Sequence, residues 1–138
     1  MRYYFDTSIW LDLFEKREEF PYKFTSVQRL LKYIRLHNDK IVYSKAVIDE
    51  LRKLGYSSFE LGILFRRFRQ LLIRVWQTKH HYGKAKDLAA KRDIPFFDAL
   101  HALLAREAKA ILISRDKDFQ RLQDIVINKK PEEIIQAS

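Results

Sequence analysis

Short apolar runs and longer amphipathic segments alternate along the chain. Four runs combine β-branched or aromatic residues with polar boundaries: RYYF (2–5), KIVYS (40–44), LIRVW (72–76) and AILIS (110–114). A fifth and shorter run, DIVIN (124–128), follows near the C-terminus. Runs of this length and composition are typical of buried strands, so the pattern predicts four or five strands.

Apolar residues in the intervening segments recur with the spacing of a helix. The segments with this spacing cover residues 24–34, 47–54, 61–68, 84–92 and 95–104. A further helix is expected to begin near Ser8. Ser57 or Ser58 is available as an N-cap for the helix that follows it, and Pro95 suits the first turn of the last helix.

Strands that alternate with helices predict an α/β fold. We expect a mainly parallel sheet of four to five strands flanked by helices, although two helices between neighbouring strands leave an antiparallel member open. A length of 138 residues suits one compact domain, residues 1–138. The last segment, 129–138 (KKPEEIIQAS), starts polar and is expected to end the chain as a loosely held tail.

The composition limits the cellular compartment and the classes of partner that we expect for this domain. Lys and Arg total 27 against 18 Asp and Glu, a net charge of +9. Such a field attracts polyanions, chiefly nucleic acid or an anionic membrane surface, with solubility alone as the alternative. The absence of Cys excludes thiolate zinc sites and favours a reducing cytoplasm. No apolar run approaches the ~20 residues of a membrane span, and no signal peptide precedes RYYF, so we expect a soluble cytoplasmic protein.

Four acids fall where the predicted strands and helices meet at one edge of the sheet. Asp6 ends the first strand, and Asp116 lies two residues beyond the fourth. Glu50 lies early in the helix that leaves the second strand, and Asp98 lies in the first turn of the helix that leads into the fourth. Ligands of open parallel sheets bind beyond the carboxyl ends of the strands. We therefore expect these carboxylates in one pocket.

Each acid also has a purely structural explanation. Asp6 can cap the first helix, Asp98 can be favoured by a helix dipole, and Asp116 and Asp118 can be turn formers. A common position at one edge is harder to explain in this way.

Glu50 has a structural alternative and a neighbouring competitor. It can be a solvated helical residue paired with Lys53. Asp49 is adjacent, but on a helix it points about 100° away from Glu50, so only one of the two can face the pocket.

Converging carboxylates indicate a bound cation, because like charges a few ångström apart force at least one pKa upward. Hard oxygen ligands without soft ones favour Mg²⁺ or Mn²⁺ over zinc. Such a metal activates water and stabilises charge on a phosphate, while a basic surface holds the phosphodiester backbone. Thr7, Ser8 and Ser114 would hydrogen-bond the carboxylates or a metal-bound water.

The quoted residues resemble the motifs of the PIN-domain family of metal-dependent ribonucleases. The matching pieces are FDTS (5–8), VIDEL (47–51), PFFDALHA (95–102) and LISRDKDF (112–119). The resemblance implies a Rossmann-like sheet of strand order 3-2-1-4-5, dependence on Mg²⁺ or Mn²⁺, and RNA as the substrate. It makes four residues the catalytic and metal-binding acids, with Asp118 as an additional candidate: Asp6, Glu50, Asp98 and Asp116.

The compact size of the chain is similar to that of single-domain VapC-type toxins. The family resemblance already implies a homodimer, and the likeness to VapC-type toxins adds an antitoxin protein that blocks the site. The segment 72–83 (LIRVWQTKHHYG) carries no family signature. The residues themselves do not separate a toxin from an RNA-processing enzyme.

Other residues have competing interpretations. Arginines interleaved with apolar residues can grip an RNA backbone or form a solvated helix face: Arg66, Arg67, Arg69 and Arg74. His80 and His81 are adjacent and are expected at the surface rather than as a metal pair. His101 can approach the pocket or belong to the core.

Trp10, Leu13 and Phe14 form an apolar stripe on the first helix. Core burial is the favoured interpretation, and a dimer or antitoxin contact is the alternative.

Three function classes follow from these observations. The first is a Mg²⁺- or Mn²⁺-dependent endoribonuclease, either the toxin of a type II toxin–antitoxin pair or a processing enzyme. The second is a non-catalytic RNA-binding module that keeps the acids for folding. The third, a small phosphatase or receiver-type domain, would use Asp6 as a phosphoacceptor, but no lysine is placed convincingly beside it.

Overall fold

The computed structural model describes residues 1–19 and 22–136. Its strands form one five-stranded sheet in the order β3-β2-β1-β4-β5. They are β1 (Arg2–Phe5), β2 (Lys40–Tyr43), β3 (Leu72–Arg74), β4 (Ile111–Ile113) and β5 (Asn128–Lys129). Every strand pairing in the described part of the chain is parallel. The predicted α/β fold and its strand order are therefore confirmed, and the antiparallel option is not taken.

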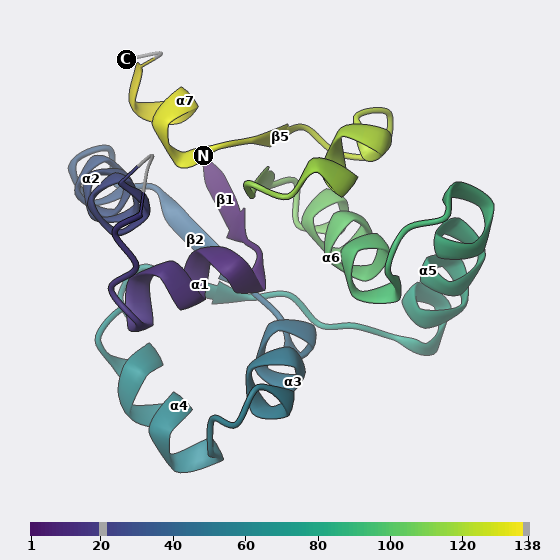
Figure 1. Cartoon of the computed structure of the whole chain (residues 1–138), viewed down its shortest axis with the longest axis horizontal. Helices are drawn as coiled ribbons and strands as arrows, with labels where there is room; N and C mark the ends of the chain where they lie inside the picture. The colour runs from purple at the N-terminus through teal and green to yellow at the C-terminus, as the bar shows by residue number, and fades with distance from the viewer. Residues whose placement is uncertain (20–21, 137–138) are drawn as a thin grey trace.

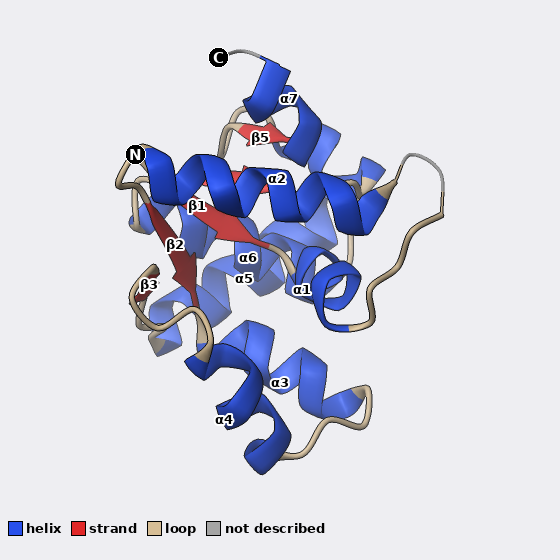
Figure 2. Cartoon of the chain, turned by 90° about the vertical axis from the view of Figure 1, so that its left-hand side faces the viewer, coloured by secondary structure: helices blue, strands red, loops and turns tan. Residues whose placement is uncertain are grey.

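Helices cover both faces of this sheet. They are α1 (Thr7–Phe14), α2 (Lys23–Leu36), α3 (Lys45–Lys53), α4 (Ser58–Arg66), α5 (Lys79–Arg92), α6 (Phe96–Glu107), the 3₁₀ helix η1 (Lys117–Leu122) and α7 (Pro131–Gln136). Helix α2 crosses one face, and α5 and α6 lie behind the other (Figure 2). Helices α3 and α4 lie beyond the end of β2 to which its arrow points (Figures 1 and 2). No helix of the described residues is both long and apolar enough to cross a membrane.

The central strand shows why the sequence forms this sheet. Tyr3, Tyr4 and Phe5 are consecutive, and all three are buried. A strand that is paired on both sides and covered on both faces reads as a continuous apolar run rather than an alternating one. Trp10 is fully buried at the start of the chain's first helix and packs against Phe5 with ring centroids 5.3 Å apart. Core burial is thus the correct interpretation of Trp10.

Side-chain caps set the starts of several helices. Ser57 is the N-cap of α4 and forms a capping box with Glu60, as one of the two serines was expected to do. Thr78 caps α5 through His81, so that helix begins at Lys79, earlier than the predicted 84. Pro95 lies at the N-cap of α6 instead of within its first turn.

The C-terminal segment differs from the prediction. Residues 124–127 form no strand, because the amides of Ile125 and Val126 both donate to the carbonyl of Leu122 and continue a turn. Strand β5 begins only at Asn128. The expected loose tail is instead helix α7, which buries Ile134 and packs against α2. Residues 137–138 of the predicted tail lie outside the described residues.

Candidate metal centre and active site

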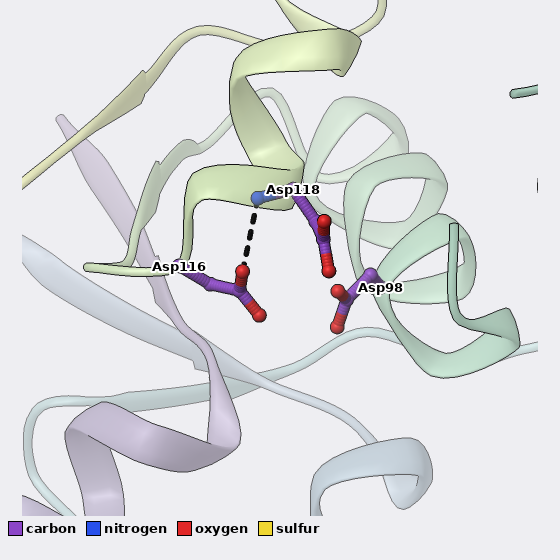
Figure 3. A group of neighbouring side chains, drawn as sticks. All are labelled: Asp98, Asp116 and Asp118. Carbon is purple, nitrogen blue, oxygen red and sulfur yellow. Dashed lines mark hydrogen bonds between the residues drawn. The ribbon is translucent and has the colours of Figure 1, made fainter. Parts of the chain in front are cut away.

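Three carboxylates form the tightest acidic cluster of the described residues. Asp98 lies in the first turn of α6, and Asp116 and Asp118 lie at the start of η1. Each offers one oxygen, and these oxygens lie within 4.8 Å of one another. Figure 3 shows the Asp116 and Asp118 side chains directed toward Asp98 across the space between the two helices. The Asp118 amide donates to Oδ1 of Asp116 at 2.9 Å, which sets the start of η1.

Among the three acids of this cluster, Asp98 has the least favourable environment for a negative charge. Burial raises its pKa to about 8, and the negative charges of other acids add to the rise: Asp116, Asp6, Asp118 and Glu50. Its Oδ2 atom is buried and has no hydrogen-bond partner among the described residues. A buried carboxylate oxygen without a partner is costly, and the other acids act in the same direction. A cation between them would relieve both effects.

Asp6 is held rigidly beside this cluster at the end of β1. Its Oδ1 accepts hydrogen bonds from the Ser8 hydroxyl (2.8 Å) and the Ile9 amide (3.0 Å), so it is also the N-cap of α1. Its Oδ2 accepts from the Ser114 hydroxyl at 2.5 Å. Burial raises the pKa of Asp6, although these three hydrogen bonds and nearby His101 oppose the rise. The capping interpretation of Asp6 is correct, and its negative charge adds to the raised pKa of Asp98.

Ser114 joins two of the acids. Its hydroxyl donates to Asp6 and accepts from the Asp116 amide at 3.0 Å. The end of β1 and the end of β4 are therefore linked through one side chain, which sets the separation of their acids.

Glu50, from α3, also acts electrostatically on Asp98; we call the group of Asp6, Glu50, Asp98, Asp116 and Asp118 the pocket. Its Oε1 accepts from the Thr7 hydroxyl at 2.6 Å and forms a short hydrogen bond with Nε2 of His101. Burial acts to raise the pKa of Glu50, but the hydrogen bonds from His101 and Thr7 and the charges of His101 and Lys53 outweigh it, so its pKa is lowered. Asp49 instead points outward and pairs with Lys45 at 2.9 Å. Helical geometry thus brings Glu50, not Asp49, to the pocket.

A chain of buried hydrogen bonds holds the His101 side chain that bonds to Glu50. The Tyr4 hydroxyl lies 2.7 Å from Nδ1 of His101 and 2.6 Å from the Ser44 hydroxyl. Burial raises the pKa of Tyr4 well above its ordinary value, so the phenol stays protonated. Tyr4 thus bridges Ser44 and His101, and Nε2 of His101 in turn bonds to Glu50. His101 is almost fully buried, so it is a core residue and a neighbour of the pocket at once.

The donor set fits a hard divalent cation. All its atoms are carboxylate or hydroxyl oxygens, which Mg²⁺ and Mn²⁺ prefer. Asp98, Asp116 and Asp118 are close enough to share one ion, and the Oδ2 atom of Asp98 lacks another partner. Asp6 lies within electrostatic reach of Asp98 but is not a member of that cluster.

Comparison with known proteins agrees with this geometry. The family model described as the PIN domain matches residues 3–125. This match spans most of the chain and contains every acid of the pocket. The chain belongs to the PIN domain family.

Solved structures share the PIN domain fold of this chain. VapBC2 from Rickettsia felis, bound to a DNA fragment from its promoter, aligns with a TM-score of 0.70 and 20% identity over 94% of this chain and 98% of that one. VapBC-1 from nontypeable Haemophilus influenzae aligns at 0.66 and 24% identity over 96% and 99%. A toxin–antitoxin complex from Klebsiella pneumoniae aligns at 0.65 and 18% identity over 93% and 96%. No curated protein matched the sequence.

The four arginines that were singled out in the sequence lie at two separate sites of the structure. Arg66, Arg67 and Arg69 line one cavity beside the start of β3. Arg74 lies at the other end of that strand, where its guanidinium stacks 4.0 Å from the ring centre of Trp76. The four therefore do not form one continuous patch. His80 is exposed, and His81 serves the cap of α5; neither joins a metal cluster in the described part of the chain.

Sequence reasoning missed the side chains that hold His101 beside Glu50. Tyr4 and Ser44 look like ordinary strand residues, and only their burial next to His101 reveals their role. Arg115 was also missed. It lies between Ser114 and Asp116 and pairs with Glu132 of α7 at 2.6 Å. A polar residue predicted inside an apolar run, such as Tyr4, was the available signal.

Proposed function

We propose that this PIN domain is a Mg²⁺- or Mn²⁺-dependent endoribonuclease that hydrolyses RNA phosphodiester bonds. The main support is Asp98: a buried carboxylate oxygen without a partner, facing four other acids from separate parts of the chain. Family membership supports a nuclease, and the excess of basic residues supports a nucleic-acid substrate. The protein carries a net charge of +9, yet this pocket is acidic. A metal ion bound by the acids could contact the phosphate of a nucleic acid that the basic surface attracts.

The acids have distinct roles in this proposal. Asp98, Asp116 and Asp118 would hold the cation directly, with Asp6 and Glu50 completing the wall of the pocket. The bound ion would supply Lewis-acid stabilisation of the phosphate and an acidified water. Asp118, expected only as an addition, enters the direct set because its oxygen lies in the cluster.

Hydroxyl groups and His101 keep these acids in place. Ser8 and Ser114 occupy both oxygens of Asp6 and leave it no freedom to rotate. His101 and Thr7 hold Glu50 ionised, so that Glu50 can accept a hydrogen bond from a water at the pocket. Preorganised acids of this kind lower the reorganisation needed when charge develops on the phosphate.

The proposal extends to a toxin of a type II toxin–antitoxin pair. The aligned structures from Rickettsia felis, Haemophilus influenzae and Klebsiella pneumoniae are toxin–antitoxin assemblies or VapBC proteins by name. By this analogy the protein would act in the cytoplasm as a homodimer and be blocked by an antitoxin. A short antitoxin-like gene directly upstream, and growth arrest on expression that Asp6→Asn relieves, are the expected signs.

Cleavage of a mixed RNA pool by the purified protein tests the nuclease. We expect cleavage with Mn²⁺ or Mg²⁺, none with EDTA, and a loss of at least about a hundredfold in rate for Asp6→Asn. Asp49→Asn is the matched control, because Asp49 is the neighbour of Glu50 on α3 yet pairs with Lys45. Equal rates for wild type and folded Asp6→Asn would refute the assignment. Salt-sensitive RNA binding without cleavage would favour the non-catalytic RNA-binding module.

A further inference from the structure

A second charged site lies away from the acids. Five cations line one cavity of about 560 Å³, and no acid does: Arg35, Lys40, Arg66, Arg67 and Arg69. The cavity floor includes Phe68 and Leu71. We call this cavity the basic pocket.

The charges of the basic pocket are not neutralised within the described protein. None of its five cations takes part in an ion pair of the described residues. The nearest acid in sequence, Asp39, is paired with the N-terminal ammonium group at 3.2 Å. Lys40 donates to the Gln70 carbonyl rather than to an acid. Charges gathered in one concavity without counter-charges raise the local concentration of anions.

Local backbone structure brings the arginines together. After α4 the chain makes successive tight turns, in which the amides of Phe68, Arg69 and Leu71 bond to carbonyls three residues back. These turns display Arg66, Arg67 and Arg69 around one hollow. Arg35 enters from the last turn of α2, and all four arginines are exposed.

The basic pocket and the acids lie at opposite edges of the sheet. Lys40 is the first residue of β2, and Leu71 immediately precedes β3, so the pocket lies at the amino ends of these strands. The acids follow the carboxyl ends. The four residues of β2 alone span about 13 Å. An anion in the basic pocket is therefore not the phosphate that meets the acids.

We propose that the basic pocket binds the phosphate backbone of RNA at a point remote from the bond that is cut. This inference rests on the proposed ribonuclease function. Guanidinium groups match phosphate oxygens in a bidentate fashion, and several arginines in one hollow suit consecutive phosphates. The substrate is then an RNA long enough to reach from the carboxyl edge to the amino edge. Short oligonucleotides would occupy the acidic pocket alone.

A charge-matched pair of triple variants tests this site. The first is Arg66→Ser, Arg67→Ser and Arg69→Ser, whose side chains make no hydrogen bond in the described structure. The control removes the same charge from the exposed face of α5 by Lys84→Ser, Lys86→Ser and Lys91→Ser. Binding of a labelled single-stranded RNA of about 30 nucleotides is measured by fluorescence anisotropy against salt concentration.

We expect the arginine variant to bind this RNA at least about tenfold more weakly, and its slope of log K against log salt to shrink by about 2, at roughly 0.7 per phosphate contact. The lysine control should keep the wild-type slope. Cleavage of an oligonucleotide of about four nucleotides should be equal in all three proteins, because it reaches only the acids.

The outcomes separate the two proposals. A short substrate cleaved normally, with the same salt slope in wild type and the arginine variant, overturns the basic pocket and leaves the nuclease intact. Wild-type RNA binding that depends on the arginines, without any cleavage, retains the pocket and refutes the nuclease. Unchanged RNA binding with lost binding of a polyglutamate peptide would also overturn the RNA assignment, in favour of an acidic protein segment.

Discussion

At the scale of single residues, the pocket gathers acidic side chains whose negative charges repel one another in the folded chain. At Asp98, burial and four neighbouring acids all act against the ionised form. Glu50 is spared by hydrogen bonds from His101 and Thr7. Function sites commonly hold such unfavourable charges because the ligand, rather than the protein, neutralises them.

Replacing Asp98 should separate stability from metal binding. In EDTA we expect Asp98→Asn to be more stable than wild type by on the order of 1 kcal/mol, a rise in Tm of about 4 °C, since a repelled carboxylate is removed. Mn²⁺ should raise the Tm of wild type by mass action and leave Asp98→Asn nearly unchanged. Thermal unfolding with and without Mn²⁺ measures both effects. Asp49→Asn is the control, and a full Mn²⁺ response in Asp98→Asn would contradict the metal assignment.

Asp12 predicts a pH dependence outside the pocket. Burial raises the pKa of Asp12 from its ordinary 3.8 to about 6, and Asp6 adds to the rise. Three cations oppose the rise: Lys23, Arg115 and Arg17. Because the folded pKa is the higher one, Asp12 contributes stability at pH values below about 4, and this contribution is lost as the pH rises through about 6.

Asp12→Asn should therefore exceed wild type in stability near pH 7.5 by on the order of 1 kcal/mol, and the difference should vanish near pH 4. The difference in Tm between the two proteins across this range is the measurement. A difference that is constant with pH, or that grows on acidification, would show that Asp12 is ionised in the folded state with a normal or lowered pKa.

At the scale of elements, the C-terminal helix is tied to the loop that carries the acids. Arg115 lies between Ser114 and Asp116, and its guanidinium reaches Glu132 of α7 at 2.6 Å and approaches Asp12 of α1 at 4.0 Å. Helix α7 in turn packs on α2. The loop that contains Arg115 is thereby connected to both α1 and α7.

Glu132→Gln should weaken this connection. Arg115 would keep a partly buried charge with only the more distant Asp12 as its partner, so we expect the free energy of unfolding to fall by about 1–2 kcal/mol. Glu133→Gln is the matched control, because its carboxyl oxygen only accepts from the Lys130 amide and glutamine can do the same. Urea unfolding measures the loss. If both variants unfold alike, the connection from α7 to the loop contributes little.

At the scale of the whole molecule, two opposite fields share a small domain. The excess of nine positive charges attracts polyanions at long range, while the partly buried acids repel them at short range unless a cation is present. The basic pocket and the acidic pocket lie at opposite edges of one sheet. The fold keeps them apart through the length of its strands.

Salt should act differently on these two fields. Raising the salt from about 0.05 M to 0.5 M shortens the screening length to roughly 4 Å and should weaken RNA binding strongly. The Mn²⁺-dependent rise in Tm should change far less, because its ligands are close together and partly buried. Anisotropy and thermal unfolding over one salt series give both results. A parallel loss of the two signals would indicate that Mn²⁺ binds only at exposed surface acids.

The sequence by itself determined the alternation of strands and helices, four of the five strands, and the edge at which the acids meet. These depend on hydrophobic periodicity and on the directionality of parallel crossovers, which are local or topological properties. Helical rotation also showed that only one of Glu50 and Asp49 can face the pocket, and the family resemblance favoured Glu50.

Only the tertiary structure decided which side chains hold Glu50 and where the C-terminal elements of the fold lie. Partners more than forty residues apart, such as Glu50 with His101 or Tyr4 with His101, leave no periodic signal. Strand β5 and helix α7 depended on contacts with β4 and α2 that override weak local preference. The separation of Arg74 from Arg66 follows from the passage of the chain along β3, because sequence proximity does not fix which end of a strand a side chain occupies.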